Sequence, residues 1–454
     1  MKKRILITIC TSGFYLFAFS QPELPDANHP DIIITGYETE VPQKCIEPEE
    51  HQYLKNRIAK SVRHMKEAGL LQKHFGERSH MTHPLFDWPM RQADGFNDPG
   101  YYAISNYVDL DPTSPGILDF NGLNQTYDGH DGIDIRTDPY FWKKKADNHV
   151  EAIAAEDGII ILKQDGNFDN NCSCMGTWNA VFLVHADGSV TWYGHLKTGT
   201  TTAKDSGDFV AVGEYIGLIG SSGCSTNPHL HFEVYDDMGN RIEPFFGSSN
   251  NTTTESWWED QLPYYDSGIN KLATHSTAPT APACPGVETP NEKYVFDQGE
   301  AITFSIAVRH SITTDSAKLE VFEPDNDQSD ILDLTFIRVG TFFFRTFIGV
   351  WNRTLDADAE MGQWRYRVTY YSDSYPPDVV ETNFWVAEDC AANIVHNTPL
   401  TTEAYYQASN TITSSSSISN SIQIVYDAEN VTRLLPGFIA PVGCRFEVKT
   451  AGCN

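Results

Sequence analysis

Basic residues and long apolar runs are both scarce in this chain of 454 residues. Lys and Arg together number 32, against 61 Asp and Glu, which gives a formal net charge of -29. A field of this sign repels phosphate backbones, so nucleic acid is excluded as a partner. Beyond the first twenty residues no stretch approaches the roughly 20 apolar residues that cross a bilayer, so no membrane span is expected.

The first twenty residues have the pattern of a secretory signal peptide. Three cations at residues 2–4 precede an apolar run over residues 5–19, and Ala18 and Ser20 place small side chains at the −3 and −1 positions of a cleavage site. We therefore expect the protein to be secreted and to work outside the cell, in the periplasm or at the cell surface.

The nine cysteines suit an oxidising compartment. One lies in the predicted signal peptide and leaves an even set, for which disulfides are the expected state in an exported protein. From their positions we predict two pairs, Cys284–Cys390 and Cys444–Cys453. The remaining four cysteines are left unassigned, because sequence alone cannot fix connectivity.

Composition and periodicity divide the rest of the chain into five parts, residues 21–100, 101–250, 251–285, 286–390 and 391–454. In the first part Leu54, Ile58, Val62 and Met65 recur at helical spacing, which predicts one amphipathic helix. Packing of this helix on a neighbouring domain is the main interpretation, and a propeptide is the alternative.

The remaining parts predict a mainly β protein. Residues 101–250 combine short apolar strands with turn dipeptides such as Asp157-Gly158, which is typical of an antiparallel β domain. Residues 251–285 are rich in Thr and Pro and are predicted to be a linker.

Polar and apolar residues alternate in the part at 286–390, for example from Trp364 to Tyr370. This pattern predicts an immunoglobulin-like β-sandwich. Residues 391–454 contain short strand-like pieces and predict a small C-terminal β module.

Two residue pairs in the part at 101–250 have the spacing of metal ligands. His130 and Asp134 stand four residues apart, and His229 and His231 stand two apart. On a strand, even spacing places both members of a pair on one face, so we expect two adjacent strands to direct these groups to one point. Two imidazoles and a carboxylate with an open fourth position are the coordination of a catalytic zinc.

Other reactive residues in this part have structural interpretations. Ser221 and Ser222 lack the Gly-x-Ser-x-Gly pattern and are assigned to a turn. Cys224 is expected in a disulfide instead of acting as a nucleophile. His185 lies at a predicted strand end and is assigned a structural role, and Tyr127 is expected to pack instead of donating to an oxyanion.

Around the histidine pairs the sequence resembles the lysostaphin-type (LytM-like) zinc peptidases, which cut peptide bonds in bacterial cell walls. The likeness covers residues 127–245, and Asn227 departs from it where the family usually has glycine. Its elements occur in the family's order: His130–Asp134, Ile153–Gly158, Asn179–Val181 followed by His185, Tyr193–Leu196, Gly213–Gly217 and Gly220–Glu233.

This resemblance implies a set of site residues. His130, Asp134 and His231 become the zinc ligands, and His195 and His229 become the catalytic histidines that do not bind the metal. One of these two takes the proton of the attacking water, and the other stabilises the oxyanion or protonates the leaving amine. Which histidine performs which task stays open.

The implied substrate is peptidoglycan, at its stem peptides or crosslinks. Two alternatives remain: a zinc peptidase that cuts glycine-rich proteins with the same site, and a non-catalytic cell-wall-binding regulator with the same fold. The tail at 391–454 resembles the strand-stack module at the ends of many secreted Bacteroidota proteins. It is expected, with the sandwich, to position the peptidase.

Overall fold

A computed structural model describes residues 33–36, 46–76, 83–312, 314–325, 327–335, 346–387 and 390–452. Over these residues the chain is mainly β, as predicted, with three α-helices. None of the helices in this described part is long and apolar enough to span a membrane. The predicted signal peptide at 1–20 lies outside the described residues.

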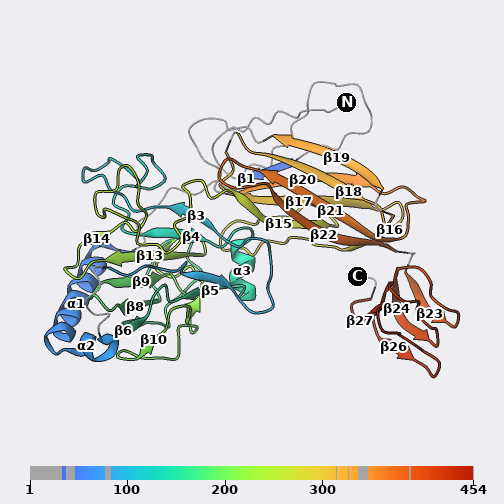
Figure 1. Cartoon of the computed structure of the whole chain (residues 1–454), viewed down its shortest axis with the longest axis horizontal. Coiled ribbons are helices and arrows are strands. Elements are labelled where there is room, and N and C mark those ends of the chain that lie inside the picture. Colours follow the sequence, from blue (N-terminus) through green and yellow to red (C-terminus); the bar gives the residue numbers. More distant parts are fainter. Residues whose placement is uncertain are drawn as a thin grey trace.

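An 8-stranded antiparallel sheet forms the centre of the part that carries the metal-ligand motifs (Figure 1). Its order is β10-β6-β8-β9-β13-β4-β3, and β14 pairs with β13. The strands are β3 (Ala103–Asn106), β4 (Ile133–Arg136), β6 (Gly158–Gln164), β8 (Ala180–Val184), β9 (Val190–Gly194), β10 (Phe209–Val210), β13 (His229–Tyr235) and β14 (Arg241–Ile242). The predicted antiparallel β domain is thus present.

Both faces of this sheet are buried, which explains why strands such as β8 are apolar throughout. One face contributes Ile133, Leu230 and Phe232 to a core that also includes side chains of a 3-stranded sheet. The strands of that small sheet are β2 (Met90–Gln92), β5 (Val150–Ile153) and β11 (Tyr215–Leu218).

The helices α1 (Pro48–Glu67) and α2 (Leu70–Phe75) cover the other face of the sheet (Figure 1). Leu54, Ile58 and Val62 of α1 are buried and share a core with sheet residues such as Phe182 and Trp192. The amphipathic helix predicted from the sequence is therefore confirmed, and it packs on the sheet of the metal-ligand motifs.

Two disulfides tie together the loops beside this sheet. Cys174 of β7 (Ser173–Cys174) lies opposite Cys224 of β12 (Cys224–Ser225) and is bonded to it. Cys172 is bonded to Cys284, across a sequence separation of 112 residues. The disulfide expected for Cys224 is confirmed.

Both disulfide pairs predicted from position are wrong. Cys284 is bonded to Cys172, so it cannot pair with Cys390. Cys444 is a free thiol, which rules out its predicted bond to Cys453. Pairing follows from which chain segments lie side by side, and the segment around Cys284 lies against the loop that holds Cys172 instead of near the end of the sandwich strands.

Two sheets pack face to face in the next part of the chain (Figure 1). One has the order β1-β20-β17-β15, with β1 (Ile33–Gly36), β15 (Gly268–His275), β17 (Ala301–Arg309) and β20 (Thr346–Thr354). The other has the order β16-β22-β21-β18-β19, with β16 (Val295–Asp297), β18 (Ser316–Phe322), β19 (Gln328–Thr335), β21 (Gly362–Tyr371) and β22 (Asp378–Ala387). Phe304, Trp351 and Trp364 contribute to the core between them.

The structure differs from the linker expected over residues 251–285. Trp257 and Trp258 are buried in the core between the 8-stranded sheet and the 3-stranded sheet, which we call the first core. Strand β15 pairs along its length with β17 of the sandwich. Pro- and Thr-rich flanks conceal this strand in the sequence. The limits of the predicted domains themselves stay predictions.

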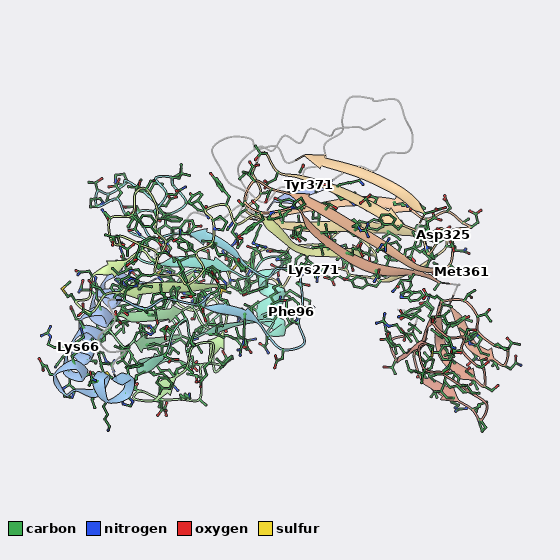
Figure 2. All side chains as sticks on the ribbon, viewed as in Figure 1. Lys66, Phe96, Lys271, Asp325, Met361 and Tyr371 are labelled. Carbon is green, nitrogen blue, oxygen red and sulfur yellow. A yellow bond between two sulfur atoms is a disulfide. The ribbon has the colours of Figure 1, made fainter. Side chains whose placement is uncertain are left out.

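Polar contacts join the sandwich to the sheet of the metal-ligand motifs. Lys271 of β15 lies at this junction (Figure 2), and its Nζ is 2.9 Å from a carboxylate oxygen of Asp98. His310 Nε2 donates to the carbonyl oxygen of Ile104 in β3 at 2.8 Å. The sandwich therefore covers the β3 edge of the main sheet, an edge that would otherwise be open to pairing.

Parallel strand pairs form the C-terminal module. Its strands are β23 (Ala391–His396), β24 (Ala404–Ser414), β25 (Gln423–Ala428), β26 (Val431–Leu434) and β27 (Arg445–Lys449). Ile412, Ile424 and Tyr426 are buried in its own small core. The predicted C-terminal β strands are present, while the resemblance to the Bacteroidota module stays a prediction.

Candidate metal centre and active site

Three side chains converge at the contact between β4 and β13. Asp134 of β4 lies opposite His231 of β13, and its Oδ1 is 2.8 Å from His231 Nδ1. His130 Nε2 is 3.1 Å from the same Oδ1 and 3.4 Å from His231 Nδ1. All three residues are buried, and their ligand atoms could hold one metal ion.

His130 reaches this point from a turn and not from a strand. We expected His130 and Asp134 on one face of a strand, but β4 begins only at Ile133. Glycine at position 132 lets this turn approach the ring of His231, where a Cβ would be 2.8 Å from Cε1. A larger residue than glycine at position 132 would push the turn that carries His130 away from His231.

Neighbouring groups fix the orientation of the first two candidate ligands. His130 Nδ1 donates to the carbonyl oxygen of Tyr107 at 2.7 Å, so its Nε2 is the nitrogen with the lone pair. Asn106 Nδ2 donates to Asp134 Oδ2 at 2.8 Å, so Oδ1 faces the two imidazoles. Outer partners of this kind accompany metal ligands in proteins.

A buried carboxylate orients His231 in the same way. Its Nε2 lies 2.8 Å from Glu233 Oε1, and the hydroxyl of Tyr235 donates to Glu233 Oε2 at 2.6 Å. Burial raises the pKa of Glu233, but His51 and His231 outweigh that effect and hold the pKa well below its ordinary value. Glu233 is therefore a carboxylate that accepts a hydrogen bond from His231 Nε2–H, which leaves the lone pair of Nδ1 for a metal.

The electrostatics also keep Asp134 ionised. Burial raises its pKa, while the imidazoles of His130 and His229 lower it by a larger amount, so the pKa lies well below the ordinary value. An ionised, buried carboxylate and the imidazole nitrogens around it together form a donor set for a divalent cation.

Two more histidines stand beside this trio. His195 follows β9 and its Nδ1 donates to the carbonyl oxygen of Ser222 at 2.6 Å, while His229 Nδ1 donates to the carbonyl oxygen of Asn227 at 2.7 Å. Each Nε2 therefore carries a lone pair. The ring centroids are 4.5 Å apart, and His229 Nε2 is 3.5 Å from Asp134 Oδ1. The structure thus brings together all five site residues predicted from the sequence.

Comparison with known families identifies the part of the chain around this site. Residues 128–244 match the sequence profile of peptidase family M23. These residues are a peptidase family M23 domain. The domain includes all five predicted site residues.

Curated relatives match about a third or less of this chain. The chain is 40% identical over 145 residues to the DD-carboxypeptidase/endopeptidase Mpg of Neisseria meningitidis, which is 32% of this chain and 27% of that protein. It is 29% identical over 123 residues to the cell division protein DipM of Caulobacter vibrioides, which is 27% of this chain and 17% of that protein. The chain thus spans about a quarter or less of the length of these relatives.

A solved structure also aligns with part of the chain. The catalytic domain of lysostaphin from Staphylococcus simulans shares 22% sequence identity with a TM-score of 0.21, covering 32% of this chain and 89% of that one.

The serines and the cysteine of the M23 domain have structural contacts. Ser221 Oγ donates to the carbonyl oxygen of Asn171 at 2.8 Å, and Ser222 Oγ donates to that of Leu196 at 3.0 Å. Both hold the loop whose carbonyl group orients His195. The turn expected for the two serines is not what the structure has, since Ser221 forms a β-bridge with Asn170 and Ser222 follows it; Cys224 is in its disulfide.

His185 and Tyr127 also have the packing surroundings expected for them. The His185 ring nitrogens contact the carbonyl oxygen of Asp157 at 2.9 Å and the hydroxyl of Thr191 at 2.8 Å, away from the ligand trio. The ring of Tyr127 stacks on His130, with 4.3 Å between centroids.

Sequence reasoning missed the groups that orient the ligands. Glu233 stands two residues after His231, and strand periodicity alone would have placed it on the same face. Asn106, whose β3 pairing with β4 is irregular, gave no such signal.

Proposed function

We propose that this chain is a secreted zinc metalloendopeptidase that hydrolyses peptide bonds in the stem peptides or crosslinks of peptidoglycan. The observation that carries the proposal is the convergence of His130, Asp134 and His231 beside His195 and His229, inside an M23 domain. The relative named DD-carboxypeptidase/endopeptidase supports a peptide of the cell wall as the substrate.

The donor atoms fit zinc. A tetrahedral ion about 2.1 Å from each ligand keeps its ligands about 3.4 Å apart. The three donor atoms of His130, Asp134 and His231 are separated by 2.8, 3.1 and 3.4 Å. Two neutral imidazoles and one carboxylate leave a fourth position, which is the pattern of catalytic zinc sites.

The chemistry divides between the metal and the histidine pair. Zinc held by these residues would lower the pKa of its water to about 7 and polarise the scissile carbonyl group. His195 and His229 stand beside these ligands with lone pairs on Nε2, because each Nδ1–H is anchored to a backbone carbonyl oxygen. We assign to this pair the transfer of the attacking water's proton to the leaving amine.

The cell location follows from the same proposal. A peptidoglycan peptidase works outside the cytoplasm, which agrees with the predicted signal peptide and with the disulfides Cys172–Cys284 and Cys174–Cys224. The sandwich and the C-terminal module then serve to place the enzyme on its polymer.

Digestion of purified peptidoglycan sacculi tests the proposal. The zinc-loaded protein is incubated with sacculi, and mass spectrometry identifies the released peptides. We expect fragments from wild type and from the exposed-surface control His64→Ala, and none from His231→Ala. Intact sacculi with wild type, or equal release by His231→Ala, would overturn the proposal. Cleavage confined to a glycine-rich protein would favour the alternative substrate.

A further inference from the structure

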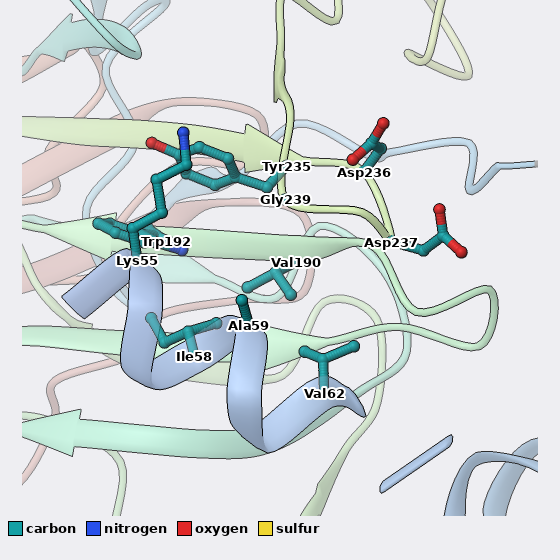
Figure 3. A pocket seen from close by; sticks show the side chains of 10 residues that line it. All are labelled: Lys55, Ile58, Ala59, Val62, Val190, Trp192, Tyr235, Asp236, Asp237 and Gly239. Atoms are coloured by element: carbon teal, nitrogen blue, oxygen red, sulfur yellow. The ribbon is translucent and has the colours of Figure 1, made fainter. Parts of the chain in front are cut away.

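One strand of the M23 domain carries a row of polar side chains that extends beyond the metal site. His229, His231, Glu233 and Tyr235 alternate along β13 with residues of the first core, so all four lie on one face. Helix α1 covers the far end of this row. Figure 3 shows Tyr235 and Trp192 beneath the helix, beside Lys55 and Ile58.

The first turn of α1 places His51 against this row. Its Nε2 is 3.0 Å from Glu233 Oε2 and 3.0 Å from the hydroxyl of Tyr235. Its ring lies against Trp192, with 5.2 Å between centroids, and only 13% of its side chain is exposed. His51 is therefore largely shielded from solvent.

The partners of His51 connect it to the candidate ligands at both ends. Glu233 is fully buried, at 0% exposure, and accepts from His231 Nε2 through its other oxygen at 2.8 Å. His51 Nδ1 faces Asp131, the neighbour of His130, at 3.6 Å. Asp131 in turn forms a 2.7 Å ion pair with Arg241.

Glu233 depends on these contacts for its position. A buried carboxylate is stable only while its oxygens accept hydrogen bonds. Without His51, Oε2 would keep the hydroxyl of Tyr235 as the partner described above, and the charge would gain freedom to turn toward water entering under α1. The hydrogen bond from His231 Nε2 to Glu233 would then be weaker.

We propose that His51 is a positioning residue of the metal site, which holds Glu233 against His231 and makes helix α1 a working part of the M23 domain. The inference rests on the proposed function, because it takes His231 as a metal ligand. It deepens that function by assigning a role to a helix that lies outside residues 128–244. Removal of α1 as a propeptide would weaken the metal site.

Zinc affinity measures this role without any use of catalysis. Full-length protein is stripped of metal and titrated with zinc in competition with a chromophoric chelator. We expect His51→Leu to bind zinc about tenfold or more weakly, since outer-shell changes cost roughly 10–100-fold. His51→Gln, whose amide can still donate to Glu233, should stay within about threefold of wild type. His64→Leu, exposed on the same helix, is the matched control and should not change.

Each outcome separates the inference from the proposed function. Wild type that binds no zinc, or His231→Ala that binds it equally well, contradicts the proposed function. Zinc binding by wild type with an unchanged affinity in folded His51→Leu overturns the role of His51. If circular dichroism shows that His51→Leu does not fold, His51→Asn replaces it, because its shorter amide cannot reach Glu233. The same two readings of zinc affinity then decide.

Discussion

Replacing Asn106 with leucine tests whether the outer partner of Asp134 supports a metal site. Leucine has nearly the same shape but removes the Nδ2 donor, which lies 2.8 Å from Asp134 Oδ2. Asn106 is only 7% exposed, so water cannot readily replace the lost hydrogen bond. Oδ1 keeps its contacts to His130 and His231, while Oδ2 loses this buried partner.

The size of the effect follows from the charge on Asp134. A hydrogen bond to a charged group contributes about 1.5–3 kcal/mol. Each 1.36 kcal/mol corresponds to about a tenfold change in an equilibrium constant. Part of this energy stabilises the metal-free fold, because the hydrogen bond exists there as well. If about 1 kcal/mol of it is lost from the free energy of unfolding, roughly 0.5–2 kcal/mol remains for metal binding, so we expect zinc affinity to fall by about 2–30-fold.

The adjacent Ser105 supplies the control. Its hydroxyl donates to the backbone carbonyl oxygen of Asp134 at 3.2 Å and does not touch the carboxylate. Ser105→Ala should lower the free energy of unfolding by a similar amount and leave zinc affinity unchanged. Zinc competition titrations and urea unfolding of both variants check this. Asn106→Leu with wild-type zinc affinity, or an equal loss in Ser105→Ala, would refute the reasoning.

Three further predictions concern the fold and its surroundings. Leu54→Ala should lower the free energy of unfolding by about 2–5 kcal/mol in urea titrations, because the Leu54 side chain is fully buried on the sheet-facing side of α1. The control Tyr53→Ala, at the exposed neighbouring position, should change the free energy of unfolding by less than about 0.5 kcal/mol. Burial raises the pKa of Asp266, but Arg309 outweighs it and holds that pKa below its ordinary value. The unfolded chain therefore binds more protons as the pH falls below about 4, so wild type should lose stability over that range faster than Asp266→Asn in urea titrations at several pH values. Because the chain has a net charge of -29, release of peptides from an anionic wall should rise between low and moderate salt, and a steady fall would count against a wall substrate.

Local spacing predicted the two residue pairs at the candidate metal centre, and the family resemblance implied which three of the residues are ligands. Asp134 and His231 lie on neighbouring strands, and an antiparallel register sets them opposite each other. His130 was expected on a strand but lies in the turn before β4, and the close approach of Gly132 to the His231 ring exists only in three dimensions. The helix from Pro48 to Glu67 followed directly from its apolar periodicity.

Contacts between distant segments could not be predicted. His51 meets Glu233 across 182 residues, and its neighbours in α1 reveal only that the helix is amphipathic. The bond between Cys172 and Cys284 depends on where the chain runs after the M23 domain. In each case the position of one element on another decides the contact, and no local pattern encodes it.

A crystal of the zinc-loaded protein, measured at the zinc absorption edge, tests the central claim most directly. We predict one anomalous peak in the M23 domain, about 2.0–2.2 Å from His130 Nε2, Asp134 Oδ1 and His231 Nδ1. Zinc bound elsewhere in the chain, with these three atoms left without an ion, would contradict the proposed metal centre.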